Sequence, residues 1–88
     1  MDDPLETRMV DLLNDRRIAF ERPERDTGDP TNLDFYLPEL DMYIEVKQFH
    51  TDRIARQLAK VPESKTAMVL IGPKAVEDLE ALCTLLWR

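Results

Sequence analysis

Two short runs of strand-forming residues, separated by only four residues, constrain the fold of this chain most. The runs are Leu33–Leu37 and Met42–Lys47, and the segment Pro38–Asp41 lies between them. Runs of this kind around a four-residue loop are typical of an antiparallel β-hairpin. The loop length sets a register that pairs Leu37 with Met42, Tyr36 with Tyr43, Phe35 with Ile44, and Asp34 with Glu45.

Alternation along the two strands predicts one apolar and one charged face, because successive side chains point to opposite sides of a sheet. The apolar face receives Leu33, Phe35, Leu37, Met42, Ile44 and Val46, and the other face receives Asp34, Tyr36, Tyr43, Glu45 and Lys47. Asp34 and Glu45 then oppose each other, and facing like charges destabilise a strand pair. A bound divalent cation would remove that repulsion. The alternative is a solvated hairpin face in an acidic protein.

The charged face carries groups suited to phosphodiester hydrolysis. Carboxylates such as Asp34 and Glu45 are hard ligands for Mg²⁺, with Mn²⁺ as a substitute, and the ion activates both phosphate and attacking water. Lys47 follows Glu45 on the same face, where its ammonium is expected to orient that water or offset charge on the phosphate. Glu6 borders the apolar stripe of the first helix and is a further candidate ligand, although the helix dipole alone also favours a glutamate there.

The remaining segments complete an α/β pattern. We predict helices over 4–17, 51–61 and from 73 onward, strands over 18–23, 33–37, 42–47 and 67–71, and a polar loop over 24–32. The run 67–71 is apolar throughout, which is typical of a strand buried on both faces. The helix before it implies a right-handed crossover that sets this strand parallel to 42–47. The expected fold is a single α/β domain over residues 1–88, in the order αβββαβα, with a mixed four-stranded sheet flanked by helices.

Composition limits the function classes. The formal net charge of −6 argues against holding nucleic acid by bulk electrostatics, since such domains usually present a basic surface. The single cysteine, Cys83, excludes an internal disulfide, and no Cys/His spacing suggests zinc. No apolar run approaches the roughly 20 residues that span a bilayer, and the acidic start is unlike a secretory signal, so we expect a cytoplasmic protein without membrane contact.

The residues of the hairpin resemble the PD-(D/E)XK nuclease superfamily, which has the restriction-endonuclease-like fold. The matching segments are Leu33–Pro38 and Tyr43–Lys47, with Glu6 ahead of the Leu12-Leu13 pair in the first helix. The family's core order, αβββαβ, agrees with the predicted elements over nearly the whole chain. The resemblance implies Asp34 and Glu45 as metal ligands, Lys47 as the catalytic lysine and Glu6 as an accessory acid. Leucine stands at position 33, where the motif's name has proline.

A second group of residues is a candidate for nucleic-acid contacts. Arg53, Arg56 and Lys60 recur at helical spacing and could meet phosphates, although a solvated helix face explains them equally well. Gln48 follows Lys47 directly, so it too could lie near the site. Packing is the expected role of Cys83 and Trp87 near the C-terminal end.

The leading hypothesis is therefore a small Mg²⁺-dependent endonuclease that hydrolyses DNA phosphodiester bonds. Without extra elements to grip a defined sequence, the chain resembles structure-selective or nonspecific members, and a homodimer or larger complex would supply further binding surface. One alternative is a non-catalytic module of the same fold that binds protein or nucleic acid, its acidic face meeting a basic partner. Another is an accessory subunit of a larger nuclease complex.

Overall fold

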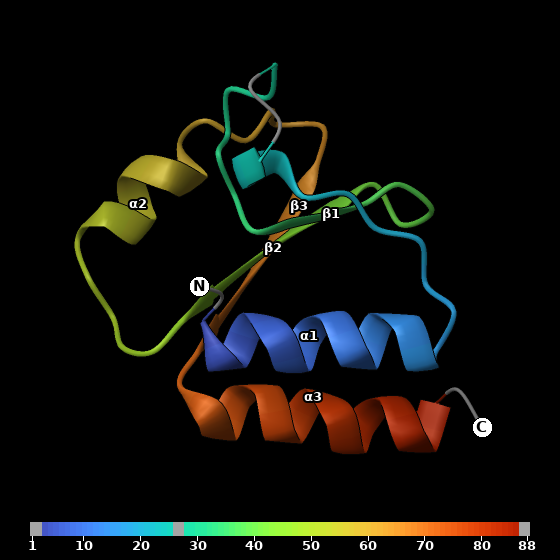
Figure 1. Cartoon of the computed structure of the whole chain (residues 1–88). Helices are drawn as coiled ribbons and strands as arrows, with labels where there is room; N and C mark the ends of the chain where they lie inside the picture. Colours follow the sequence, from blue (N-terminus) through green and yellow to red (C-terminus); the bar gives the residue numbers. More distant parts are fainter. Residues whose placement is uncertain (1–2, 26–27, 87–88) are drawn as a thin grey trace.

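A computed structural model describes residues 3–25 and 28–86, and within them a three-stranded mixed sheet packs against helices (Figure 1). The elements in chain order are α1 (Pro4–Asp15), the 3₁₀ turn η1 (Pro23–Arg25), β1 (Phe35–Leu37), β2 (Met42–Lys47), α2 (Arg53–Leu58), β3 (Thr66–Ile71) and α3 (Pro73–Leu86). The strand order is β1-β2-β3, so β2 is central. The predicted α/β class is confirmed.

The predicted hairpin register is present in β1 and β2. The antiparallel pairs are Phe35 with Ile44, Tyr36 with Tyr43, and Leu37 with Met42. β3 then pairs with β2 in parallel, from Met42 opposite Thr66 to Lys47 opposite Ile71. The crossover through α2 therefore joins parallel strands as expected, which brings the end of β2 beside the start of α3.

The predicted strand over 18–23 is absent, which corrects the sheet from four strands to three within the described residues. Only Glu21 bridges to β1, exchanging backbone hydrogen bonds of 2.8 and 3.0 Å with Tyr36. Pro23 has no N–H to extend the ladder and begins η1 instead. β1 itself is only three residues long, so it offers little edge for a further strand.

The hydrophobic core lies between the sheet and the α1–α3 pair, which run side by side along one side of the sheet (Figure 1). Its buried members are Leu5, Met9, Leu12, Leu13, Phe35, Leu37, Ile44, Val46, Leu70, Val76 and Cys83. The predicted inward faces of the hairpin and of α1 are thus confirmed, as is the packing role of Cys83. Trp87 lies outside the described residues.

Two helices are shorter than predicted. α1 ends at Asp15 because Arg17 adopts a left-handed backbone conformation with φ of 56°, which a continuing helix cannot contain. α2 ends at Leu58, and the next residues form tighter turns in which Lys60 N–H donates to Gln57 and Val61 N–H to Leu58. No helix among the described residues is long and apolar enough to cross a membrane.

The prediction that 67–71 is buried on both faces is wrong. β3 lies at the edge of the sheet, where Leu70 is buried but Ile71 is 40% exposed. An entirely apolar run cannot distinguish an edge strand from a central one, since its periodicity carries no information on how many faces are covered. The central strand is β2, whose four inner residues are all buried.

Candidate functional site

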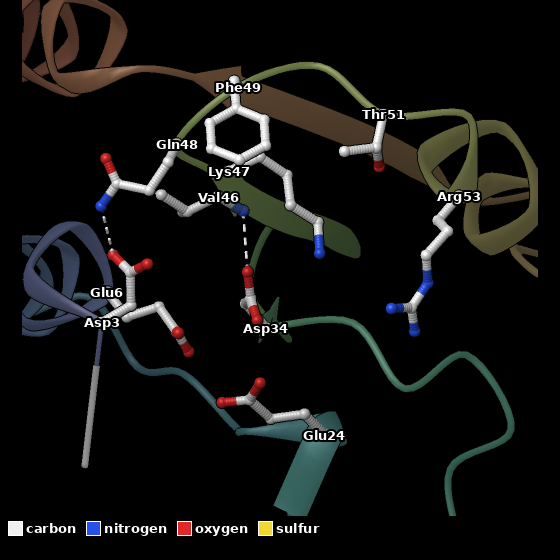
Figure 2. A pocket seen from close by; sticks show the side chains of 10 residues that line it. All are labelled: Asp3, Glu6, Glu24, Asp34, Val46, Lys47, Gln48, Phe49, Thr51 and Arg53. Carbon is white, nitrogen blue, oxygen red and sulfur yellow. Dashed lines mark hydrogen bonds between the residues drawn. The ribbon is translucent and has the colours of Figure 1, made fainter.

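Three carboxylates from separate segments converge at one end of the hairpin. One oxygen from each of Glu6, Glu24 and Asp34 lies within 4.8 Å of the other two. Glu6 is in the first turn of α1, Glu24 is in η1, and Asp34 directly precedes β1. In Figure 2 the side chains of Glu6 and Glu24 point toward Asp34. We call these three residues the carboxylate cluster.

Local backbone chemistry positions Glu6. The side chain of Asp3 accepts a 2.7 Å hydrogen bond from Leu5 N–H and caps α1, and Pro4 occupies a first-turn position. Asp3 is therefore the N-cap of α1. Because the helix starts at Pro4, Glu6 falls in its first turn on the side next to the sheet, as the sequence predicted.

Two hydrogen bonds from backbone N–H groups to carboxylates join Asp34 to Glu45 and Val46 of β2. Val46 N–H donates to Asp34 Oδ2 at 2.8 Å, and Asp34 N–H donates to Glu45 Oε1 at 3.0 Å. These bonds continue the strand pairing one step beyond Phe35 and Ile44, with carboxylates in place of backbone carbonyls. The sequence-predicted opposition of the two acids is therefore present, and the two bonds hold both carboxylates beside the start of β1.

Glu45 lies behind Asp34 and pairs with the predicted lysine. It is only 1% exposed, and its Oε2 atom lies 3.0 Å from Nζ of Lys47. That distance makes an ion pair, but the angles do not make a hydrogen bond, so Oε2 is buried without a hydrogen-bond partner among the described residues. Lys47 is about one-third exposed, and Figure 2 shows its amine extending toward the space in front of Asp34.

Arg22 supplies an internal counter-charge to the carboxylate cluster. Its guanidinium donates to Glu6 Oε1 at 2.8 Å and to Glu24 Oε1 at 2.7 Å, while its Nε donates to the Asp34 carbonyl at 3.0 Å. The same group stacks on Phe35, with its carbon 4.5 Å from the ring centre. Its side chain is 14% exposed, so these bonds are largely shielded from water.

Crowding of the acids shifts their proton affinities apart. Burial raises the pKa of Asp34 to about 9, and carboxyl hydrogen bonds with Glu45 and Glu24 act in the same direction. Burial and the neighbouring Glu24 also raise the pKa of Glu6 to about 7. Burial alone would raise the pKa of Glu24, but hydrogen bonds from its carboxyl neighbours and from Arg22 lower it. The cluster therefore retains protons near neutral pH.

The cluster lines a cavity of about 360 Å³ whose other walls carry cations and an aromatic ring (Figure 2). Its lining consists of Asp3, Glu6, Glu24, Asp34, Val46, Lys47, Gln48, Phe49, Thr51 and Arg53. Of the predicted nucleic-acid contacts, Arg53 and Gln48 are present in this lining. Arg56 and Lys60 are exposed on or after α2 and do not line the cavity.

The donor set suits a hard divalent cation. Two oxygens on opposite sides of Mg²⁺ lie about 4.2 Å apart, since Mg–O bonds are about 2.1 Å, so the separations in the cluster require at most small side-chain shifts. Glu6, Glu24 and Asp34 would hold such an ion. Glu45, which the sequence also predicted as a metal ligand, lies behind Asp34, is paired with Lys47 and does not line the cavity.

Sequence reasoning missed two members of the site, Glu24 and Arg22. Both lie around Pro23, in a stretch interpreted as the end of a strand and the start of a polar loop, where no periodicity predicts which way a side chain points. The only sequence signal for Glu24 was weak, since it is a glutamate that directly follows the proline at the end of the predicted strand. The predicted group of Asp34, Glu45, Lys47 and Glu6 is nevertheless gathered at one end of the hairpin.

Comparisons with known protein families, with curated proteins and with solved structures found no match for this chain. A proposal for what this chain does must therefore rest on the geometry of the cavity and on the residues that line it.

Proposed function

We propose that this chain is a divalent-cation-dependent endonuclease that hydrolyses DNA phosphodiester bonds, and that it is a minimal member of the PD-(D/E)XK superfamily. One observation carries the proposal. Carboxylates from α1, η1 and the start of β1 converge within 4.8 Å of one another in a cavity that Lys47 and Arg53 also line. Carboxylate oxygens are the ligands that Mg²⁺ prefers, and a cation beside them in the same cavity matches the charge of a phosphate.

The residues of the chain have distinct roles in this proposal. Glu6, Glu24 and Asp34 would hold Mg²⁺ or Mn²⁺, which when bound supplies Lewis acidity to the phosphate and to the attacking water. The Lys47 ammonium extends into the cavity, where it stabilises negative charge that develops on the phosphate. Glu45 positions Lys47 through their 3.0 Å ion pair and orients Asp34 through its backbone N–H.

A non-catalytic binding module of the same fold is the second candidate, and Arg22 is the observation that favours it. Its guanidinium already satisfies Glu6 and Glu24, so the cluster is neutralised in part without any ion. The net charge of −6 also suits a basic partner more than DNA. The two candidates differ in whether the carboxylates bind a cation and whether DNA is cut.

Cleavage of labelled single-stranded, duplex and branched DNA with Mg²⁺ or Mn²⁺, against EDTA, tests the proposal. We expect cation-dependent products, and a loss of rate of about 100-fold or more in Asp34→Asn because a ligand carboxylate is removed. Lys47→Met is expected to lose about 100-fold, because a group that stabilises the transition-state charge is gone.

Matched controls separate the site from general charge effects. Glu63→Gln removes an exposed carboxylate that does not line the cavity, and Lys74→Met removes an exposed lysine on α3. Both should cleave at the wild-type rate. Equal rates in Asp34→Asn, Lys47→Met and these controls would contradict the proposal, and absence of any cation-dependent product would favour the binding module.

A further inference from the structure

Among residues 3–25 and 28–83, the most exposed large apolar side chain lines the candidate site. Phe49 lies in the loop between β2 and α2 and is 71% exposed, compared with 54% for Leu40. Single exposed apolar residues are common and need no explanation by themselves. Phe49 differs from the others because it lines the same cavity as the carboxylate cluster, as Figure 2 shows.

The same loop brings a cation to the cavity. Arg53, at the start of α2, extends its guanidinium into the open side in Figure 2. Within residues 3–25 and 28–86, no carboxylate forms an ion pair with Arg53, so its five N–H donors are open to a phosphate. An aromatic ring and a guanidinium that line the same cavity offer complementary contacts for a base and a backbone phosphate.

The net charge of the molecule indicates which of these two contacts contributes more to binding affinity. At a net charge of −6, phosphate contacts from Lys47 and Arg53 compete with repulsion from the remaining acids, so electrostatic affinity for nucleic acid is low. Stacking of a base on an aromatic ring needs no charge. It strengthens binding by roughly 5- to 150-fold per base. In an acidic protein, an exposed aromatic ring at the site can therefore supply affinity for nucleic acid that the charges do not.

We propose that the cavity takes one unpaired nucleotide of a single-stranded nucleic-acid segment, with its base stacked on Phe49 and its phosphate beside Arg53. This inference rests on the proposed function and names its substrate class. The bases of a duplex are already stacked on both faces, so one of them reaches Phe49 only after it is unpaired and flipped out. The cavity volume of about 360 Å³ is within the range of pockets that hold a single small ligand, roughly 300–1,000 Å³.

Fluorescence anisotropy with a labelled single-stranded oligonucleotide and a fully paired, blunt-ended duplex of two strands tests the inference. Ca²⁺ replaces Mg²⁺ to occupy the carboxylates, and a gel verifies that each probe remains intact. The wild type should prefer the single strand by about tenfold or more. Phe49→Ala and Phe49→Leu should lose about tenfold in affinity for it, and Phe49→Trp should retain the affinity because the aromatic face persists.

Leu40→Ala is the matched control, because Leu40 is an exposed apolar residue outside this cavity. It should bind like the wild type. Wild-type affinity in Phe49→Ala, equal affinity for both probes, or full retention in Phe49→Leu would each overturn the stacking site. If cleavage depends on Asp34 while Phe49→Ala binds normally, this inference fails and the proposed function stands. If Phe49→Ala weakens binding but no cleavage occurs, the nuclease proposal fails and the stacking site stands.

Discussion

At the scale of single residues, Arg22 offsets part of the repulsion among the three acids of the carboxylate cluster when no cation is bound. Three acids within 4.8 Å repel one another, and protonation or a positive charge must compensate. Arg22 provides part of that charge by bonding Glu6 and Glu24, and its planar group is held in place over Phe35. The cluster is thus preorganised by the chain's own guanidinium, which a divalent cation would supplement or displace.

Arg22→Met should destabilise the cation-free protein and make its stability respond to Mg²⁺. The loss of largely buried hydrogen bonds to charged groups costs about 2 kcal/mol in free energy of unfolding. Binding of Mg²⁺ to the carboxylates that have lost their Arg22 partner should recover part of that loss, because ligands of the folded state add stability. Urea unfolding followed by circular dichroism, in EDTA and in saturating Mg²⁺, measures both effects.

Arg8→Met is the control for this experiment. Arg8 pairs with Glu80 between α1 and α3, but its side chain is 39% exposed, so the expected loss is about 0–1 kcal/mol and independent of Mg²⁺. An equal Mg²⁺ response in both variants, or none in either, would contradict the role assigned to Arg22.

At the scale of elements, the junction of β2, β3 and α3 supports the loop that carries the cavity wall. Gly72 N–H donates to the Lys47 carbonyl at 2.7 Å and so ties the end of β3 to the last residue of β2. Gly72 has φ of 85°, a conformation that other L-residues rarely adopt. Lys47 and the residues after it therefore leave the sheet from a fixed point.

Gly72→Ala should lower the free energy of unfolding by about 1 kcal/mol, because alanine is strained in this backbone conformation. Space is not the cause, since an added Cβ would lie 3.7 Å from the nearest atom, the Gln48 carbonyl oxygen. Gly72→Asn should lose less, because asparagine tolerates positive φ. Thermal unfolding of the three proteins measures this order, and equal stability of all three would show that the strain is unimportant.

The sequence predicted the hairpin better than its surroundings, for a physical reason. A four-residue loop and strict alternation determine the register of β1 and β2, so Asp34 and Glu45 could be placed opposite each other in advance. Glu24 and Arg22 depend on how the irregular stretch around Pro23 returns to the sheet. Tertiary packing fixes that path, and local sequence patterns do not encode it.

At the scale of the whole molecule, proton binding and cation binding should oppose each other. The pKa of Asp34 rises from its ordinary value of 3.8 to about 9, so the folded protein holds a proton that the unfolded chain releases. Its contribution to stability is full below about pH 4 and is lost as pH rises toward 9. The raised pKa of Glu6 also adds stability at low pH, and this contribution is lost as pH rises toward about 7. The lowered pKa of Glu24 has the opposite effect, because its contribution to stability is present at higher pH and is lost as pH falls below the ordinary value of 4.5.

This linkage has a consequence for the candidate site. A cation must displace the protons held by Asp34 and Glu6, because a carboxylate binds metal in its ionised form. Cation affinity should therefore rise with pH through the range below about 9, and binding near neutral pH should release protons into the buffer.

Calorimetric titration of the protein with Mn²⁺ at about pH 6 and about pH 8, in buffers of different ionisation enthalpy, tests the central claim most directly. If one cation site is formed by Glu6, Glu24 and Asp34, Mn²⁺ should bind more tightly at the higher pH and should release protons on binding. Binding should also be lost in Asp34→Asn but not in Glu63→Gln. Absence of Mn²⁺ binding, or binding of equal strength in Asp34→Asn and the wild type, would contradict the account.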